Sequence, residues 1–238
     1  MSISEELSLR QQAIIGGERV LADSGACFAV SNPATGAVIG HVPDMGAAET
    51  RRAIEAASQA LPVWRDRPAK ERAQIMRRWF DLIMADQERL ARIITAEMGK
   101  PLGEARGEIS YGASFIDWFA EEGRRIYGDV VPSAIDRRIL VFKQAIGVTA
   151  AITPWNFPCA MFARKVGAAL GAGCTMVVKP AEFTPFSALA LSELAERAGV
   201  HRTYIGMIER AEKNITLINI GKICTGLNIR IGALLKNF

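Results

Sequence analysis

The stretch that decides the fold is ITPWNFPCAMFARKVGAALGAGCTMVVKPAEFTP, residues 152–185. Short apolar runs alternate here with helical patterns, in the order strand 147–152, loop 153–158, helix 159–170, strand 175–178, loop 179–185 and helix 186–198. Apolar strands that alternate with helices are typical of a parallel, doubly wound α/β sheet. Both loops are then expected at the carboxyl ends of their strands, where such sheets bind ligands.

These two loops carry the side chains with the clearest chemistry. Asn156 lies between a strand end and Phe157-Pro158, whose stiff backbone suits its NH2 group to donate to a developing oxyanion. Taken alone, a turn-forming asparagine explains the same pattern. Lys179 and Glu182 place a cation and a carboxylate at the next strand end, and a carboxylate there can accept from both hydroxyls of a ribose. Taken alone, this pattern does not decide whether Lys179 and Glu182 bind a ribose.

The spacing of apolar residues divides the rest of the chain into strand-like and helical segments. The first 45 residues alternate β-prone runs with turn residues and indicate hairpins. Residues 46–122 have a helical period, and we expect Trp64, Trp79 and Trp118 to pack in the core. Residues 137–145 mix β-branched and charged side chains, as a strand with one wet face does.

Composition excludes several classes of protein. The chain has 238 residues, 50% hydrophobic and 23% charged, which is enough to bury a sizeable core. Residues 1–200 hold 23 charges of each sign, so the net charge of +4 arises in 201–238 and a nucleic-acid-binding face is not expected. The opening MSISEELSLR does not resemble a secretory signal, and the 4 cysteines lack C-x-x-C spacing, so we expect a cytoplasmic protein without a zinc site.

Other common motifs are missing. The uncharged stretch 144–163 has a bilayer-spanning length, but two prolines and an asparagine break it, so a membrane helix is not expected. Neither G-x-G-x-x-G nor G-x-x-x-x-G-K-[ST] occurs, and we expect Gly167, Gly171 and Gly173 to permit close packing and to end a helix. His41 and His201 lack a partner at a recognisable spacing and are expected to be solvated. These motifs therefore offer no alternative site.

The composition changes at residue 200. Residues 1–200 contain 34 alanines, whereas 201–238 contain 2 alanines and 8 isoleucines. We favour a break in coding or a fusion near residue 200, and the alternative is a native, isoleucine-rich last element.

The motifs ITPWNFP and KPAEFTP, at this spacing, resemble the aldehyde dehydrogenase superfamily. The stretches RQQAIIGGERV, SNPATGAVIGHVPDMGAAET, AEMGKPLGEARGEISYGASFIDWFAEEGRRIYGDVVPS and KQAIGVTAAITPWNFP resemble bacterial succinate-semialdehyde dehydrogenases, so the resemblance covers residues 9–200. It implies an incomplete form of that α/β fold. The implied parts are hairpins and helices in 1–136, an oligomerisation-type strand in 137–146, the first half of the NAD(P)-binding domain in 147–200, and an unmatched tail in 201–238.

The resemblance also implies roles for individual residues. It assigns Asn156 to the oxyanion hole and Arg164 to the carboxylate of succinate semialdehyde, although without it Arg164 reads as a solvated helix charge. Lys179 and Glu182 match residues that grip the adenosine ribose. The residues that line the dinucleotide cleft are Ile152, Thr153, Pro154 and Trp155. Glu182 should repel a 2′-phosphate, so we expect NAD rather than NADP, although relatives with serine at that position use NADP.

Two catalytic groups of the family are missing. Neither the motif of its nucleophilic cysteine nor that of its general-base glutamate occurs here, and Cys159, Cys174 and Cys224 are expected to be inert. In the complete family enzyme the partner is a small-molecule aldehyde, which serves as the substrate. We therefore predict that this chain alone does not turn over an aldehyde. The alternative hypothesis is a non-catalytic binding protein that associates with itself or with full-length homologues, with no nucleic-acid or membrane partner.

The number of recognisable strands leads to two further expectations. With only 147–152 and 175–178 recognisable, NAD should bind weakly, and Met176, Val177 and Val178 should form an unpaired edge. Residues 215–220 have the composition to cover that edge, but nothing selects their register. We expect 46–122 to be ordered and 201–238 to be mobile or self-associating.

Overall fold

The computed structural model describes residues 3–200 and 205–207. Its helices are α1 (Ile3–Glu6), α2 (Ala47–Arg65), α3 (Ala69–Ala85), α4 (Gln87–Met98), α5 (Leu102–Glu122), the 3-10 helix η1 (Gly123–Arg125), α6 (Pro158–Gly171) and α7 (Pro185–Ala198). Its strands are β1 (Ala13–Ile15), β2 (Glu18–Val20), β3 (Cys27–Ser31), β4 (Val38–Pro43), β5 (Asp129–Val131), β6 (Ile139–Val141), β7 (Val148–Ile152), β8 (Thr175–Lys179) and β9 (Ile205–Met207). The predicted amino-terminal hairpins, the helical region and the alternation of strands and helices after residue 147 are confirmed.

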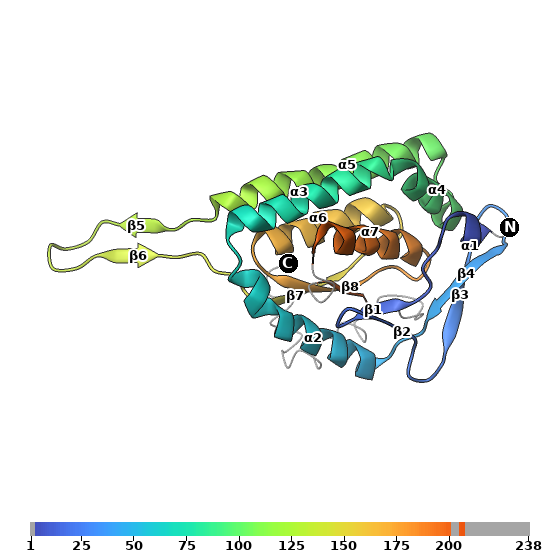
Figure 1. The fold of residues 1–238 in the computed structure, drawn as a ribbon, viewed down its shortest axis with the longest axis horizontal. Coiled ribbons are helices and arrows are strands. Elements are labelled where there is room, and N and C mark those ends of the chain that lie inside the picture. Colours follow the sequence, from blue (N-terminus) through green and yellow to red (C-terminus); the bar gives the residue numbers. More distant parts are fainter. Residues whose placement is uncertain (1–2, 201–204, 208–238) are drawn as a thin grey trace.

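A five-stranded sheet in the order β2-β1-β9-β8-β7 forms the centre of the fold. Strands β7, β8 and β9 run parallel, and β1 is antiparallel to both of its neighbours. Helix α2 lies on one side of the sheet, and α6 and α7 lie on the other, beneath α3 and α5 (Figure 1). Ile152 pairs with Lys179, so the loops after β7 and β8 leave the same edge of the sheet.

Strand β9 corrects the expectation that the sheet ends after two strands. It pairs with β8 through Met176 with Ile205 and Val178 with Met207, and β1 pairs with its other side through Ile14 with Met207. An apolar strand buried on both faces needs a partner on each edge, and three residues after position 200 supply the one that β8 lacked. The suggested partner at 215–220, and the expected mobility of the tail beyond β9, fall outside the described residues.

Two tryptophans tie the helical layers together. Trp64 and Trp79 are 0% exposed, and their indole N–H groups donate to the carbonyls of Leu170 and Leu191, each at 3.1 Å. These bonds connect α2 with α6 and α3 with α7. The expectation for Trp118 is wrong, because this side chain is 63% exposed. It lies two residues after the buried Ile116, and residues two apart on a helix face different directions.

Glycines bring α5 and α6 into close contact. A Cβ atom at Gly112 would lie 3.3 Å from the Cα of Ala160, and one at Gly171 would lie 2.7 Å from the carbonyl oxygen of Phe119. The expected role of glycines in close packing is therefore confirmed. Gly173 follows α6 with a φ of +84°, in the left-handed region that favours glycine after a helix. The close approach fixes where α6 lies against α5.

We predict that Gly171→Ala destabilises the fold, because its methyl group would meet backbone that cannot move aside. The expected loss is about 1–3 kcal/mol in the free energy of unfolding. Gly107→Ala on α5 is the control, since its Cβ would meet nothing within 4 Å, and it should stabilise the chain by up to about 1 kcal/mol. Urea denaturation measures both, and equal effects would show that the α5–α6 contact is not tight.

A hairpin of β5 and β6 extends away from the rest of the molecule (Figure 1). The strand expected within 137–145 is present as β6, but the single wet face is not, because Ile139, Leu140 and Val141 are all exposed. No helix among the described residues is long and apolar enough to cross a membrane.

Candidate functional site

The first loop at the ligand edge joins β7 to α6. The N–H group of Thr153 donates to the carbonyl of Lys179 at 3.1 Å, which ties this loop to the end of β8. Thr153 is buried and Ile152 half-buried, whereas Pro154, Trp155 and Asn156 are exposed. The loop therefore has a fixed base and presents its later side chains to solvent at the sheet edge.

The start of α6 is held by a charged residue of α5 and by one in the turn before α5. Pro158 is its first residue, and the helix has no capping side chain of its own. The Glu108 carboxylate on α5 accepts from the N–H groups of Cys159, at 2.9 Å, and Ala160, at 3.3 Å. Lys100 forms a buried ion pair with Glu108 and donates to the carbonyl of Asn156 at 3.3 Å.

Lys100 and Glu108 were not among the site residues predicted from the sequence. The signal for Glu108 is its position between Ala105 and Ile109 on the apolar stripe of α5, where a charged residue is unexpected. Lys100 lies in the turn between α4 and α5 and carries no comparable signal.

The second loop, between β8 and α7, also leads into a helix whose start is held by a buried carboxylate from another helix. Lys179 ends β8 and Glu182 lies in the turn after it, with Nζ and Oε2 3.5 Å apart and about a quarter of each side chain exposed. Helix α7 also lacks a capping side chain of its own. The buried Glu97 carboxylate on α4 accepts from the N–H groups of Phe186, at 2.8 Å, and Ser187, at 2.9 Å, and from the Ser187 hydroxyl.

The buried carboxylates create an unusual electrostatic environment. Burial raises the pKa of Glu97 to about 8, against the hydrogen bonds from Ser187 and Phe186 that lower it. Burial also raises the pKa of the Cys159 thiol well above its ordinary value, and the charges of Glu108 and Glu97 add to the effect. Cys159 is therefore a protonated thiol, the poorly reactive form.

Of the other cysteines and histidines considered in the sequence, two lie in the described part of the chain and two lie outside it. Cys174 is buried with its thiol free of any disulfide, as expected of a small core residue, and His41 is exposed. Cys224 and His201 lie outside the described residues.

Arg164 lies on the exposed face of α6. Its guanidinium carbon stands 5.3 Å from the ring centroid of Phe115 on α5, and the Tyr111 ring meets Phe115 edge-on at 4.8 Å. Cation–π contact of this kind orients an arginine while leaving its N–H groups available. The guanidinium can therefore pair with a carboxylate from solution.

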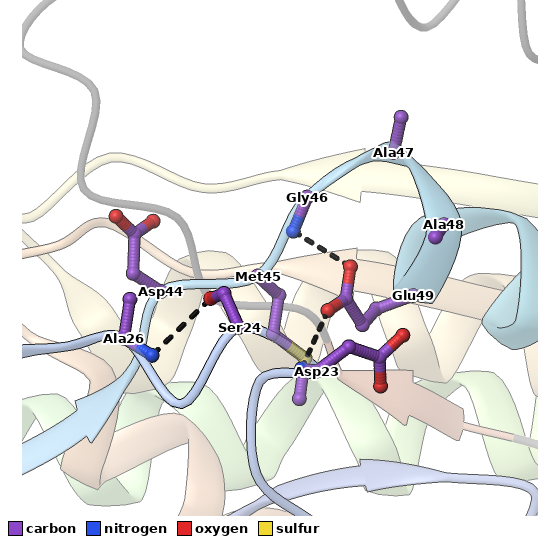
Figure 2. Close-up of a pocket in the computed structure, with 9 residues that line it drawn as sticks. All are labelled: Asp23, Ser24, Ala26, Asp44, Met45, Gly46, Ala47, Ala48 and Glu49. Atoms are coloured by element: carbon purple, nitrogen blue, oxygen red, sulfur yellow. Dashed lines mark hydrogen bonds between the residues drawn. The ribbon is translucent and has the colours of Figure 1, made fainter.

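A cavity of about 390 Å³ opens at the start of α2 (Figure 2). Its lining residues are Asp23, Ser24, Ala26, Asp44, Met45, Gly46, Ala47, Ala48 and Glu49. The Glu49 carboxylate accepts from the N–H groups of Gly46 and Asp23, each at 2.9 Å, so it already occupies donors at this helix start. The lining is acidic and includes none of the predicted site residues among those described, so the ligand edge of the sheet remains the candidate site.

Comparison with known proteins assigns the family. A profile of the aldehyde dehydrogenase family matches residues 20–217, which extends past the change in composition at residue 200. The chain is 61% identical over 209 residues to the glutarate-semialdehyde dehydrogenase of Pseudomonas aeruginosa, covering 87% of this chain and 43% of that protein. It is 63% identical over 201 residues to the succinate-semialdehyde dehydrogenase [NADP(+)] GabD of Escherichia coli strain K12, covering 84% of this chain and 42% of that protein.

A solved structure agrees with these relatives. The crystal structure of an E. coli NADP-dependent enzyme superposes with a TM-score of 0.85 at 60% identity, covering 87% of this chain and 43% of that one. The chain belongs to the aldehyde dehydrogenase family and has the α/β fold of that family over the part it spans. It spans less than half the length of the relatives that it matches. Together, strand β9 and a match that reaches residue 217 favour a native origin for the first part of the tail.

We predict that Glu97 makes stability depend on pH. Its pKa of about 8 exceeds the ordinary value of 4.5, so the folded chain keeps a proton that the unfolded chain releases in this range. The free energy of unfolding should therefore fall as pH rises from about 5 to about 8. Glu97→Gln is neutral throughout and should remove most of that fall.

Urea unfolding midpoints of both proteins, measured at the two ends of this pH range, test the prediction. Every other titratable group is present in both proteins, so its contribution cancels in the comparison. An equal fall in both proteins would contradict the assignment of the effect to Glu97.

Proposed function

We propose that this chain forms the oxyanion- and cofactor-binding part of an NAD(P)-dependent dehydrogenase for succinate semialdehyde or a similar acidic aldehyde. The observation that carries the proposal is that the loops after β7 and β8 leave one edge of the sheet and are joined by the bond from Thr153 to Lys179. This edge is where parallel sheets bind dinucleotides. We place the activity in the cytoplasm.

The residues of this edge fit a nicotinamide dinucleotide. The cofactor, when bound, accepts a hydride from the substrate. Lys179 and Glu182 are partly exposed and 3.5 Å apart, so both can reach the hydroxyls of one ribose. The exposed Trp155 and Pro154, with the half-buried Ile152, offer apolar surface to the dinucleotide, while Thr153 holds the loop through its backbone.

Asn156 and Arg164 are proposed to act on the substrate. The exposed carboxamide of Asn156 would donate to the oxyanion that forms when a thiolate attacks the aldehyde carbon. The guanidinium of Arg164 would pair with the distal carboxylate, which the names of the semialdehyde relatives imply for their own substrates. We propose that the thiolate comes from the part of the relatives that this chain does not span.

We propose NAD as the preferred cofactor. A carboxylate at position 182 accepts from a free 2′-hydroxyl and repels a 2′-phosphate. The name of the E. coli relative includes NADP(+), so the two cofactors need to be compared directly.

We predict weak but specific NAD binding by this chain, with a dissociation constant of about 1 mM or higher. Glu182→Gln and Lys179→Met should each weaken it at least about threefold, because each removes a ribose contact. Calorimetry with NAD and NADP measures this, and Glu88→Gln on α4, whose side chain is 59% exposed, is the control. The same samples should form no reduced cofactor with succinate semialdehyde.

NAD binding that neither Glu182→Gln nor Lys179→Met weakens would contradict the proposed ribose site. If the chain did turn over the aldehyde, and if Cys224→Ala abolished that turnover, the proposal that the nucleophile lies outside this chain would be contradicted.

The β5–β6 hairpin favours a second role, association with another copy or with a full-length homologue. Val130 is 74% exposed, Leu140 54% and Phe142 72%. Val130 pairs with Leu140 across the hairpin, and Phe142 directly follows β6. Exposed apolar surface of this kind on a sheet edge favours pairing with another chain.

We predict that Leu140→Glu weakens self-association by placing a charge in the apolar surface of the hairpin. Sedimentation of the unsubstituted chain should show a dimer or larger species, and the variant should shift toward monomer. Leu21→Glu is the matched control, because Leu21 is 62% exposed and lies outside the hairpin. A chain that is monomeric throughout would rule out this role.

A further inference from the structure

The pair formed by Lys100 and Glu108 lies beneath the loop that carries Asn156. The side chains are 7% and 1% exposed, and their charges contact each other directly. Removing two charges from water is unfavourable unless further hydrogen bonds satisfy them. Within the described part of the chain, the further partners of both ions lie in residues 156–160.

Each ion holds a different end of this segment. The Lys100 ammonium donates to the carbonyl of Asn156 at 3.3 Å and stands 3.9 Å from the ring centroid of Phe157. The Glu108 carboxylate accepts from Cys159 and Ala160 at the start of α6. The ion pair thus clamps the backbone on both sides of residues 157–158.

Asn156 itself is exposed, so its side chain takes its position from this clamped backbone. The upstream end of the loop is fixed separately, by the bond from Thr153 to Lys179. We propose that Lys100 and Glu108 are positioning residues, which set the place and direction of the Asn156 carboxamide through the loop backbone. This inference rests on the proposed function, in which that carboxamide donates to an oxyanion, a role that tolerates little displacement.

A purely structural role for the pair makes a different prediction. A buried ion pair that only supports packing can be replaced by neutral residues of similar volume with little change at one particular loop. The double variant Lys100→Met with Glu108→Gln tests this, because the glutamine oxygen can still accept from Cys159 and Ala160 while the bond to Asn156 is lost. Neither charge is left unpaired.

The readout is nuclear magnetic resonance of the full chain labelled with nitrogen-15. The side-chain NH2 signals of Asn156 are assigned by their loss in Asn156→Asp. In the double variant we expect these signals to shift, and the amides of Asn156 and Phe157 to exchange at least tenfold faster, while those of Val177 and Val178 in β8 keep their rates. Arg106→Gln with Glu88→Gln, a surface pair between α5 and α4, should leave all of these unchanged.

Two further variants keep the test decisive if the double variant does not fold. Lys100→Arg keeps both charges paired, and because a guanidinium presents its donors differently from an ammonium, the Asn156 signals should shift. Phe157→Leu removes the cation–π contact from a ring that is 40% exposed. Because loss of the ring shifts neighbouring signals by itself, the readout for this variant is amide exchange at Asn156, which should become faster without a change in the unfolding midpoint.

Unchanged Asn156 signals in every folded variant of the ion pair, with unchanged exchange at Asn156 in Phe157→Leu, would overturn the proposal, as would exchange that accelerates equally at all amides. None of these measurements uses cofactor or aldehyde. A responsive loop without NAD binding would therefore sustain the positioning and reject the proposed function, whereas NAD binding with an unresponsive loop would do the reverse.

Discussion

The arrangement at the ligand edge depends on two buried carboxylates that satisfy the first N–H groups of α6 and α7. The residues that precede these helices, Phe157 and Thr184, supply no capping side chain, and unpaired N–H groups there would be costly once buried. Glu108 on α5 and Glu97 on α4 accept from them instead. The outer helices thereby fix the start of both helices that follow the ligand loops.

This capping works only because the helices approach closely. Gly112 lies against the backbone of Ala160, one turn along α5 from Glu108, so the carboxylate reaches the start of α6 without a longer side chain. Gly171 gives the same closeness at the other end of α6. A substitution that moves α6 away from α5 would thus also displace the loop that carries Asn156, and this connects core packing with the candidate site.

Sequence patterns predicted what depends on local period, and missed what depends on tertiary contact. Strands β7 and β8 were predicted, as 147–152 and 175–178, from apolar runs that alternate with helical patterns, and so was their shared edge. Strand β9 was missed because three residues show no period, and only the unpaired edge of β8 explains them. Glu97 was missed because a glutamate in a helix is ordinarily solvated. Trp118 was placed in the core by residue type, although its helical phase relative to Ile116 points outward.

The supporting charges lie on α4, on α5 and in the turn between them, rather than in the ligand loops, which leaves the loop side chains free for a ligand. Asn156 and Thr153 hold the loop through their backbone atoms, which leaves the Asn156 carboxamide available to a ligand. Burial, with the charges of the two carboxylates adding to its effect, keeps the neighbouring Cys159 thiol protonated, which prevents a competing nucleophile beside the proposed oxyanion donor. A site built in this way separates the groups that hold the backbone from those that meet the substrate. A change in Lys100 or Glu108 can then displace Asn156 without altering any residue that the ligand touches.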